Sequence, residues 1–290
     1  MTLKLFSFVL IGALIGAPHA NAADTIRVYL VGGQSNADGR ASVSKLPTKP
    51  INLRQPQADI AFYFHNERGD HPLDRQWTTL RPGASESHQF GPEITFGRTI
   101  ADQVADEHTR IAIIKYANGG TNLHTQWAAG GDDSTRGDGR EYRIFKRTVR
   151  DGLKSLAASH PDDRIVLAGM IWMQGEADTH QPASASAYGD NMKRFIKDVR
   201  ATIDAKLPFV IGRLSVHQTK LQTAGVASVR QGQSDAADSL PRAAWIDTDS
   251  FQLKNDHLHF DATGQQQLGK AFADALLRLS SPDNKKVQSP

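Results

Sequence analysis

A serine, a histidine and an aspartate occupy positions from which they could act as a nucleophile, its base and an orienting acid. Ser35 follows an apolar run and two glycines, and glycines allow the tight turn that brings a hydroxyl to a strand's end. Near the other end of the chain, Asp256 lies three residues before His259, so one loop can hold both. An ionised Asp256 accepting from Nδ1–H would leave Nε2 of His259 facing a serine hydroxyl. The pattern therefore indicates acyl transfer by an activated serine.

Each of these residues also has a plain structural interpretation. Serine is a favoured helix N-cap, and the Ser35 segment taken alone favours that role. A second Gly-Gln-Ser, at residues 232–234, falls in a polar helical stretch with no strand before it, so context alone distinguishes the two copies. His259 is alternatively a capping or surface histidine. A metal site of His257, His259 and the two aspartates of the same segment is disfavoured because it has only two nitrogen ligands and no third at metal-site spacing, and we expect neither a metal nor another cofactor.

Two further stretches supply hydrogen-bond donors where predicted strands end. Residues 116–121, Tyr-Ala-Asn-Gly-Gly-Thr, offer backbone N–H groups unshielded by side chains, and Gln174 presents an amide immediately after a strand. Preorganised donors of this kind hold the oxyanion of a tetrahedral intermediate. Each stretch is also an ordinary strand exit in which glycine marks the turn. Neither identifies a site by itself.

The order of apolar and helical segments predicts a parallel sheet that would gather these stretches at one edge. Buried-strand patterns occur at residues 26–31, 110–116, 165–173, 209–214 and 243–246. Helical periodicity occurs between and after them, at about residues 92–107, 142–159, 185–206, 221–240 and 262–279. This alternation predicts a doubly wound α/β fold, in which ligands bind at the carboxyl ends of the strands. Residues 41–90 and 121–140 are expected to be long loops that wall the site.

The N-terminus predicts an exported protein. Lys4 precedes an apolar run at residues 5–17 and a small-x-small site at 20–22, which is the pattern of a signal peptide spanning residues 1–22. A transmembrane anchor is disfavoured because the apolar run is too short to cross a bilayer. We expect one domain at residues 23–279, a disordered tail at 280–290, and a secreted or periplasmic location in a bacterium.

Composition and charge limit the classes of ligand. The 290 residues include no cysteine, which excludes a thiolate nucleophile, a disulfide framework and a cysteine-based metal site. The formal net charge is only +3, and acidic and basic residues are interspersed without a cationic run. We therefore expect no nucleic-acid or membrane partner, and a ligand that is neutral or weakly charged.

Taken together and in order, these motifs resemble the conserved blocks of the SGNH-hydrolase superfamily. They are Gly-Gln-Ser-Asn at residues 33–36, Asn-Gly-Gly-Thr at 118–121, Trp-Met-Gln-Gly-Glu-Ala-Asp at 172–178 and Asp-His-Leu-His-Phe at 256–260. With Phe-Gly-Pro-Glu at 90–93, they look like the branch containing carbohydrate esterase family 6 acetylxylan esterases and sialate O-acetylesterases. The resemblance spans about residues 26–279.

This resemblance implies a fold and a set of residue roles. The fold is a flavodoxin-like three-layer α/β/α sandwich with a five-stranded parallel sheet. Ser35 is the implied nucleophile, His259 the general base and Asp256 its orienting acid. The α/β-hydrolase alternative is disfavoured because the Ser35 segment lacks the second glycine of a G-x-S-x-G elbow.

The same resemblance implies an oxyanion hole made of the Ser35 N–H, the Gly119 N–H and the Gln174 amide. Gln174 stands where the superfamily usually has asparagine. Gly119 is preferred over Gly120 because the superfamily's glycine commonly precedes a small hydroxyl residue by two positions, here Thr121.

The predicted function is a secreted serine esterase that removes O-acetyl groups from carbohydrate through an acyl-enzyme. Acetylxylan is the first substrate we expect, and an O-acetylated sialic acid the second. Trp127 and Trp77 lie in the long loops and could stack on a sugar ring, although a single tryptophan more often packs its loop onto the domain. His88 and His124 are expected to have surface or loop-packing roles.

Three other functions compete with this prediction. Glu176 and Asp178 could form the carboxylate pair of a glycoside hydrolase, but the serine and histidine would then be unexplained. A non-catalytic carbohydrate-binding domain could keep the fold without needing the intact Ser35, Asp256 and His259. A lipase or thioesterase of the same superfamily should have more aliphatic loops than residues 121–140 offer.

Overall fold

A seven-stranded sheet forms the centre of the computed structural model, which describes residues 23–67, 71–84, 86–130 and 137–281. The strand order is β4-β3-β6-β1-β7-β8-β9, and every neighbouring pair is parallel except β3 and β4. The strands are β1 (Thr25–Gly33), β3 (Gln57–His65), β4 (Thr78–Leu80), β6 (Thr109–Ala117), β7 (Arg164–Met173), β8 (Phe209–Gly212) and β9 (Ala243–Ile246). Strands β2 (Ala41–Ser42) and β5 (Gln89–Phe90) form a separate antiparallel pair.

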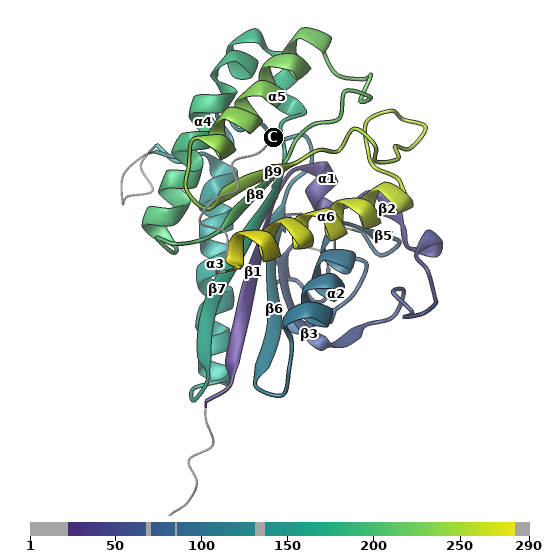
Figure 1. The fold of residues 1–290 in the computed structure, drawn as a ribbon, viewed down its shortest axis with the longest axis vertical. Coiled ribbons are helices and arrows are strands. Elements are labelled where there is room, and N and C mark those ends of the chain that lie inside the picture. Colours follow the sequence, from purple (N-terminus) through teal and green to yellow (C-terminus); the bar gives the residue numbers. More distant parts are fainter. Residues whose placement is uncertain (1–22, 68–70, 85, 131–136, 282–290) are drawn as a thin grey trace, which may run out of the picture.

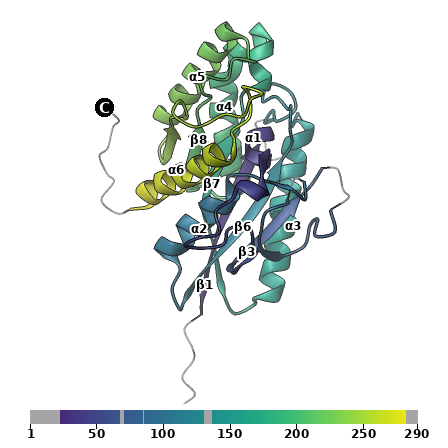
Figure 2. The ribbon, with the colours of Figure 1, turned by 90° about the vertical axis from the view of Figure 1, so that its right-hand side faces the viewer.

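Helices cover both faces of the sheet (Figures 1 and 2). They are α1 (Ser35–Asp38), α2 (Glu93–Val104), α3 (Arg140–Ser159), α4 (Pro182–Thr202), α5 (Thr223–Asp238) and α6 (Ala262–Ser280). Gly97 of α2 packs against Ile113, whereas Gly152 of α3 packs against the next residue of the strand, Ile114. Because successive strand residues point to opposite faces, α2 and α3 lie on opposite sides of the sheet.

The predicted three-layer α/β class is confirmed, and the sheet is wider than predicted. All five predicted strands are present, but β3 and β4 fall within residues 41–90, which were expected to be loop. Strand β3 lies between β4 and β6, and its residues Ile60, Phe62 and Phe64 are buried. Its short apolar run escaped the prediction because polar residues, glycines and prolines surround it on both sides.

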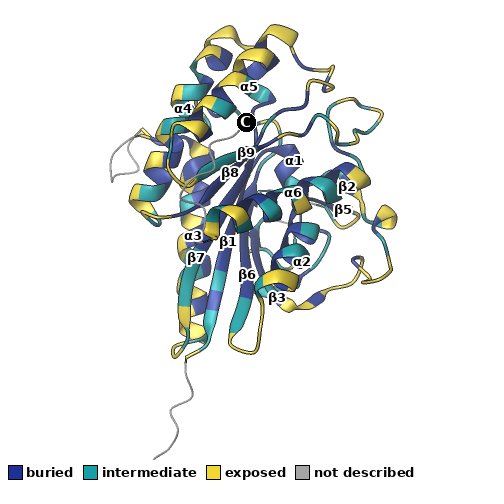
Figure 3. Cartoon of the chain, in the orientation of Figure 1, coloured by how far each residue is buried: buried dark blue, intermediate teal, exposed yellow. Residues whose placement is uncertain are grey.

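The interior is a single apolar core that follows the sheet, drawn as dark strands in Figure 3. Strand β1 at its centre is buried from Val28 to Gly33, which matches the near-continuous apolar run of a strand covered on both faces. No helix of the described residues is long and apolar enough to cross a membrane. The predicted signal peptide and residues 282–290 lie outside the described residues, and Ser280 of the expected tail is the last residue of α6.

Candidate active site

Ser35 is delivered to the carboxyl edge of the sheet by a turn that only glycine allows. Gly33, the last residue of β1, has φ +138°, and a Cβ there would lie 2.1 Å from the carbonyl oxygen of Met173. Ser35 begins the four-residue helix α1 and is itself largely buried. The chain therefore reverses within two residues of the central strand and fixes the hydroxyl at its end.

A buried ion pair holds the far end of α1. Lys115, on the neighbouring strand β6, donates from Nζ to the carbonyl oxygen of Asp38 and to Oε2 of Glu93, each at 2.7 Å. Both side chains of this pair are buried. Glu93 also accepts from the backbone N–H of Gly91, which explains the Phe-Gly-Pro-Glu motif structurally. The serine-bearing helix is thus fixed at both ends.

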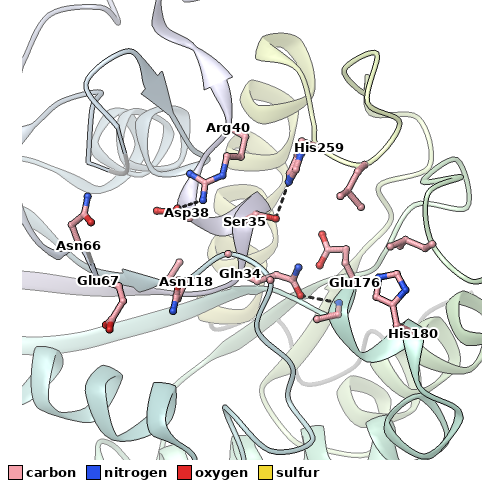
Figure 4. A pocket seen from close by; sticks show the side chains of 16 residues that line it. Gln34, Ser35, Asp38, Arg40, Asn66, Glu67, Asn118, Glu176, His180 and His259 are labelled. Atoms are coloured by element: carbon pink, nitrogen blue, oxygen red, sulfur yellow. Dashed lines mark hydrogen bonds and ion pairs between the residues drawn. The ribbon is translucent and has the colours of Figure 1, made fainter. Parts of the chain in front are cut away.

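The structure brings Ser35, His259 and Asp256 together, although they come from opposite ends of the chain. Nε2 of His259 lies 3.0 Å from Oγ of Ser35 (Figure 4), and its Nδ1 lies 2.9 Å from Oδ2 of Asp256. The other carboxylate oxygen of Asp256 accepts from the backbone N–H groups of Leu258 and His259. This is the arrangement in which a histidine takes the proton of a serine hydroxyl while a carboxylate holds its ring.

Hydrogen bonds keep Asp256 ionised. Partial burial favours the neutral acid, but bonds from the His259 backbone, the His259 ring and the Leu258 N–H outweigh that effect, so the pKa of Asp256 is lowered. An ionised Asp256 accepts from Nδ1–H of His259, which leaves Nε2 unprotonated toward Ser35.

Two backbone N–H groups at or near Ser35 are available as donors. Among the described residues, no backbone hydrogen bond uses the N–H of Ser35 or of Gly119. A Cβ on Gly119 would lie 3.5 Å from the Cβ of Ser35, whereas one on Gly120 would meet nothing within 4 Å. Gly119 is therefore the glycine packed against the serine.

Gln174 differs from its prediction, because its amide does not reach the pocket. The side chain is fully buried, and Nε2 lies near three acceptors: Oδ2 of Asp178 at 2.6 Å, the Thr121 carbonyl at 3.0 Å and Oε1 of Gln34 at 3.2 Å. Its two amide hydrogens are fully used by these neighbours. Gln174 is therefore a support beneath the site and not a direct oxyanion donor.

Gln34, which sequence reasoning left without a role, lines the pocket next to Ser35. Its Oε1 accepts from Gln174 and from the backbone N–H groups of Gly175 and Ala177. With the oxygen fixed in this way, the amide nitrogen lies on the side of Ser35 (Figure 4). The sequence contained one indication of this position: Gln34 lies between Gly33, whose positive φ allows the turn, and Ser35.

A pocket of about 600 Å³ opens over Ser35. On one side of Ser35 lie Asp38, Arg40, Asn66, Glu67 and Asn118, which we call the polar side (Figure 4). The lining residues are Gln34, Ser35, Asp38, Arg40, Asn66, Glu67, Ala117, Asn118, Gly119, Gly120, Glu176, Ala177, His180, Leu221, Leu258 and His259. Two residues of the polar side, Asn66 and Glu67, come from residues 41–90, which were expected to be loop, and sequence analysis gave neither a role.

The charged groups of the polar side are paired. Arg40 lies 2.7 Å from the carboxylate of Asp38, and Glu67 forms an ion pair with Arg140. Arg40 is the only lysine or arginine among the described residues that line the pocket. The pocket therefore offers no excess of positive charge.

Glu176 and Asp178 do not form an open carboxylate pair. Asp178 is buried and accepts from the backbone N–H groups of Leu123 and His124, so it fixes the loop after β6. Glu176 lines the pocket but is also buried, and burial raises its pKa despite a hydrogen bond from Asn36. The geometry of a glycoside hydrolase pair is absent from these two residues.

The tryptophans also differ from the sugar-stacking prediction. Trp127 is fully buried; its Nε1 donates to Oγ1 of Thr121, and its ring packs against Trp172 at a centroid distance of 5.0 Å. A side chain in the core cannot contact substrate. Trp77 packs onto α3, where Nε1 donates to the carbonyl of Gly152.

The described residues contain no group of three histidine, cysteine, aspartate or glutamate side chains able to hold a metal ion. His257 and His259 therefore do not share such a group, and His259 is engaged by Ser35 and Asp256.

Fold and site together define a hydrolase of the α/β sandwich class in which a serine, a histidine and an aspartate lie in hydrogen-bond contact. The family model described as "Carbohydrate esterase, sialic acid-specific acetylesterase" matches residues 25–278. The chain belongs to this family, and it is a carboxylic ester hydrolase acting on carbohydrate esters.

Individual relatives agree with the family assignment. A probable carbohydrate esterase of Arabidopsis thaliana is 25% identical over 268 residues, covering 87% of this chain and 90% of that protein. The X-ray structure of the Arabidopsis protein superposes with a TM-score of 0.67 at 21% identity, over 88% of this chain and 98% of the other. A carbohydrate acetylesterase from Xanthomonas citri superposes with a TM-score of 0.60 at 16% identity, over 87% of this chain and 56% of the other. These superpositions establish a shared fold.

Proposed function

We propose that this protein is a secreted serine acetylesterase that removes O-acetyl groups from a neutral carbohydrate, with acetylated xylan as the first candidate. The contact that carries the proposal is the 3.0 Å approach of Nε2 of His259 to Oγ of Ser35, backed by Asp256. A domain that only bound sugar would need none of these three side chains in this geometry.

The chemistry follows from the positions of these atoms. Oγ of Ser35 attacks the acetyl carbonyl carbon while Nε2 of His259 takes the hydroxyl proton. The bond from the acyl carbon to the sugar oxygen then breaks, and His259 gives its proton to the departing sugar alkoxide. Water, activated by the same histidine, attacks the acyl-enzyme and releases acetate.

The oxyanion that forms at the acetyl oxygen is held by donors already in place. These are the N–H groups of Ser35 and Gly119 and the amide of Gln34, which replaces Gln174 in this role. Gln174 contributes by binding Oε1 of Gln34, so that the donor end of that amide faces the serine. One such side-chain donor is typically responsible for a factor of about 10²–10³ in kcat.

The balance of charge in the pocket supports a neutral sugar. Arg40 is already paired with Asp38, and the nearby Glu67 adds a second acid. Because Arg140 is likewise paired with Glu67, a sugar carboxylate placed here would find, among the described residues, no unpaired arginine and would lie near two acids, and like charges cost affinity. The polar side offers hydrogen-bonding groups that suit sugar hydroxyls.

An O-acetylated sialic acid is the second candidate. The family description, which specifies sialic acid, supports this substrate directly. The basic start, apolar run and small-x-small site at residues 1–22 support a cleaved signal peptide. An exported enzyme could reach either substrate outside the cytoplasm. N-terminal sequencing of the exported protein should begin at Ala23.

Acetate release separates the candidates. Protein lacking residues 1–22 would be incubated with acetylated xylan and, separately, with 9-O-acetylated N-acetylneuraminic acid, alongside the Ser35→Ala variant. We expect release from xylan that depends on Ser35 and exceeds release from the sialic acid. Faster release from the sialic acid would reverse the substrate assignment, and equal release by wild type and Ser35→Ala would refute the serine mechanism.

A further inference from the structure

The histidine that faces Ser35 is held by the residue next to that serine. Nδ2 of Asn36 donates to the carbonyl oxygen of Leu258 at 3.2 Å, and its Oδ1 accepts from the N–H of Phe260 at 3.0 Å. These two backbone groups lie immediately before and after His259. One buried amide therefore clasps both peptide groups that flank the histidine.

Two further buried side chains complete this contact. Nε2 of Gln218 donates to the same Leu258 carbonyl at 2.8 Å. Oε1 of Glu176 accepts from Nδ2 of Asn36 at 2.7 Å and lies 3.4 Å from Nε2 of Gln218. The carboxyl oxygen thus binds both amides that hold the histidine loop, while its Oε2 is buried without a hydrogen-bond partner in the described residues.

We propose that Asn36 is a positioning residue that sets the distance between Ser35 and His259, and that Glu176 fixes the orientation of its amide. This inference rests on the proposed function, because it concerns how the same serine and histidine are aligned. Ser35 and Asn36 are consecutive residues of α1, so any shift of the helix moves nucleophile and clasp together. The Ser35–His259 pair therefore keeps its geometry even if α1 moves.

Glu176 is needed because an amide can bind in two orientations. Rotating the Asn36 amide by half a turn would place its oxygen against Oε1 of Glu176 and the Leu258 carbonyl, and its NH₂ against the N–H of Phe260. All three contacts would then be repulsive. A buried carboxyl in contact with Nδ2 excludes that orientation, which explains why an acid lies next to the site although, among the described residues, it forms no hydrogen bond with Ser35 or His259.

The backbone of His259 itself is bound within its own loop. The His259 carbonyl accepts from the N–H of Lys254, and its own N–H donates to Asp256. With Asn36 on the flanking groups, the backbone around the histidine is bound on both sides. A misplacement of about 1 Å at such a group costs on the order of 10² in rate.

An isosteric substitution isolates the clasp. Asn36→Asp keeps the size of the side chain and the acceptor for Phe260, but replaces the donor by an oxygen that faces the Leu258 carbonyl and Glu176. The double variant Asn36→Asp/Glu176→Gln restores a donor and an acceptor between positions 36 and 176. Asn191→Asp on α4 is the matched control, since the one side-chain hydrogen bond of Asn191 within the described residues is to His124, and neither residue lines the pocket.

The readout is kcat and KM for 4-nitrophenyl acetate, per active site titrated with an organophosphate, together with the melting temperature of each variant. We expect Asn36→Asp to lower kcat about 10²-fold with KM changed less than about threefold. The double variant should recover at least tenfold of this loss, and Asn191→Asp should behave as wild type. A role in stability alone would lower the melting temperature and leave kcat per titrated site unchanged.

Other outcomes overturn the inference without touching the proposed function. If Asn36→Asp retains kcat while Ser35→Ala is inactive, Asn36 does not position the histidine. If the double variant recovers nothing, Glu176 does not orient the amide. Should Asn36→Asp fail to fold, Gln218→Ala removes the second donor to the Leu258 carbonyl, together with the contacts of Gln218 to Glu176 and to the Ser215 N–H. A several-fold loss of kcat supports the clasp, and an unchanged kcat refutes it. Activity in Ser35→Ala would instead refute the serine mechanism.

Discussion

The tripeptide Gly-Gln-Ser occurs twice in this chain, at residues 33–35 and 232–234, and the two copies do different work. Both glutamines are buried and both bind the segment that follows β7. Gln34 accepts from the N–H groups of Gly175 and Ala177, and Gln233 donates to the carbonyl of Gln174. A buried amide that braces this strand exit is therefore common to the two copies.

The glycines show where the copies diverge. Gly33 ends a strand at φ +138° in a turn, whereas Gly232 lies within α5, where a Cβ would come 2.6 Å from the backbone nitrogen of Gly189 on α4. The first glycine permits a backbone conformation, and the second permits two helices to approach closely. Only the first presents its serine at the carboxyl edge of the sheet.

The serines differ accordingly. Oγ of Ser35 lies 3.0 Å from His259 in the pocket, while Oγ of Ser234 donates to the carbonyl of Arg230 one turn earlier in α5. The second bond is a common one for a serine inside a helix. An identical tripeptide thus gives a candidate nucleophile or an ordinary helical residue, depending on the element that carries it.

The largest effect should come from removing each serine in turn. Ser35→Ala is expected to lower kcat for 4-nitrophenyl acetate on the order of 10⁴-fold or more, because no acyl-enzyme can form. Ser234→Ala removes only a bond to a helix carbonyl and should leave kcat within about twofold of wild type. Steady-state kinetics of the two variants, at matched protein concentration, measure the contrast. Equal activity in both variants would mean that Ser35 is a structural residue like Ser234.

Replacing each glutamine by glutamate should give a smaller and qualitatively different contrast. Gln34→Glu keeps the oxygen that binds Gly175 and Ala177 but replaces the amide nitrogen near Ser35, so kcat should fall about 10²–10³-fold. Gln233→Glu instead removes the donor to the carbonyls of Gln174 and Gly212, and should reduce the free energy of unfolding by about 1–3 kcal/mol.

Kinetics and urea unfolding of both glutamate variants distinguish the two roles. The two roles differ as proposed if Gln34→Glu lowers kcat with little change in the free energy of unfolding, and Gln233→Glu lowers the free energy of unfolding with little change in kcat. A loss of stability without a loss of kcat in Gln34→Glu would contradict this difference. Gln34 would then only stabilise the segment after β7, as Gln233 does, and the oxyanion would depend on backbone donors alone.

Much of this architecture is readable from the sequence. The five predicted strands and the order of the serine, glycine and histidine motifs follow from apolar runs and strand exits, which are local features. The rule that parallel strands end at one edge places Ser35, Gly119 and Gln174 together, whereas the pairing of Ser35 with His259, which follows no strand directly, rests on the resemblance to the SGNH-hydrolase superfamily. The roles left open by local pattern, cap or nucleophile, are decided by a contact between residues far apart in the chain.

The sequence could not show where individual side chains point. Gln174 follows a strand as an oxyanion donor would, but its amide donates to the buried carboxylate of Asp178. The glutamine that lines the pocket is Gln34 (Figure 4). Trp127 lies in a loop, yet Thr121 and the aromatic core draw it inward. In both cases the side chains that surround the residue in the folded protein decide its orientation. The spacing of residues along the sequence contains no information about that orientation.

The smallest predicted effect concerns Asp256, the acid that orients His259 toward Ser35. The lowered pKa of Asp256 means that its ionised form stabilises the folded state. This contribution is present above the unfolded pKa of about 3.9 and is lost as pH falls through the lower folded value. The difference in melting temperature between wild type and Asp256→Asn should therefore shrink as pH decreases below about 4.

The effect should be modest, because the Asp256 side chain is 38% exposed and solvent screens its interactions. Thermal unfolding between pH 7 and pH 3 measures it, with Asp235→Asn, at the exposed carboxylate that follows the second tripeptide, as the matched control for losing one charge. If both variants show the same pH dependence, the hydrogen bonds to Asp256 add nothing beyond the loss of a surface charge. If only Asp256→Asn converges with wild type in acid, the carboxylate behind His259 is ionised and bound in the folded protein, as its role in orienting the base of Ser35 requires.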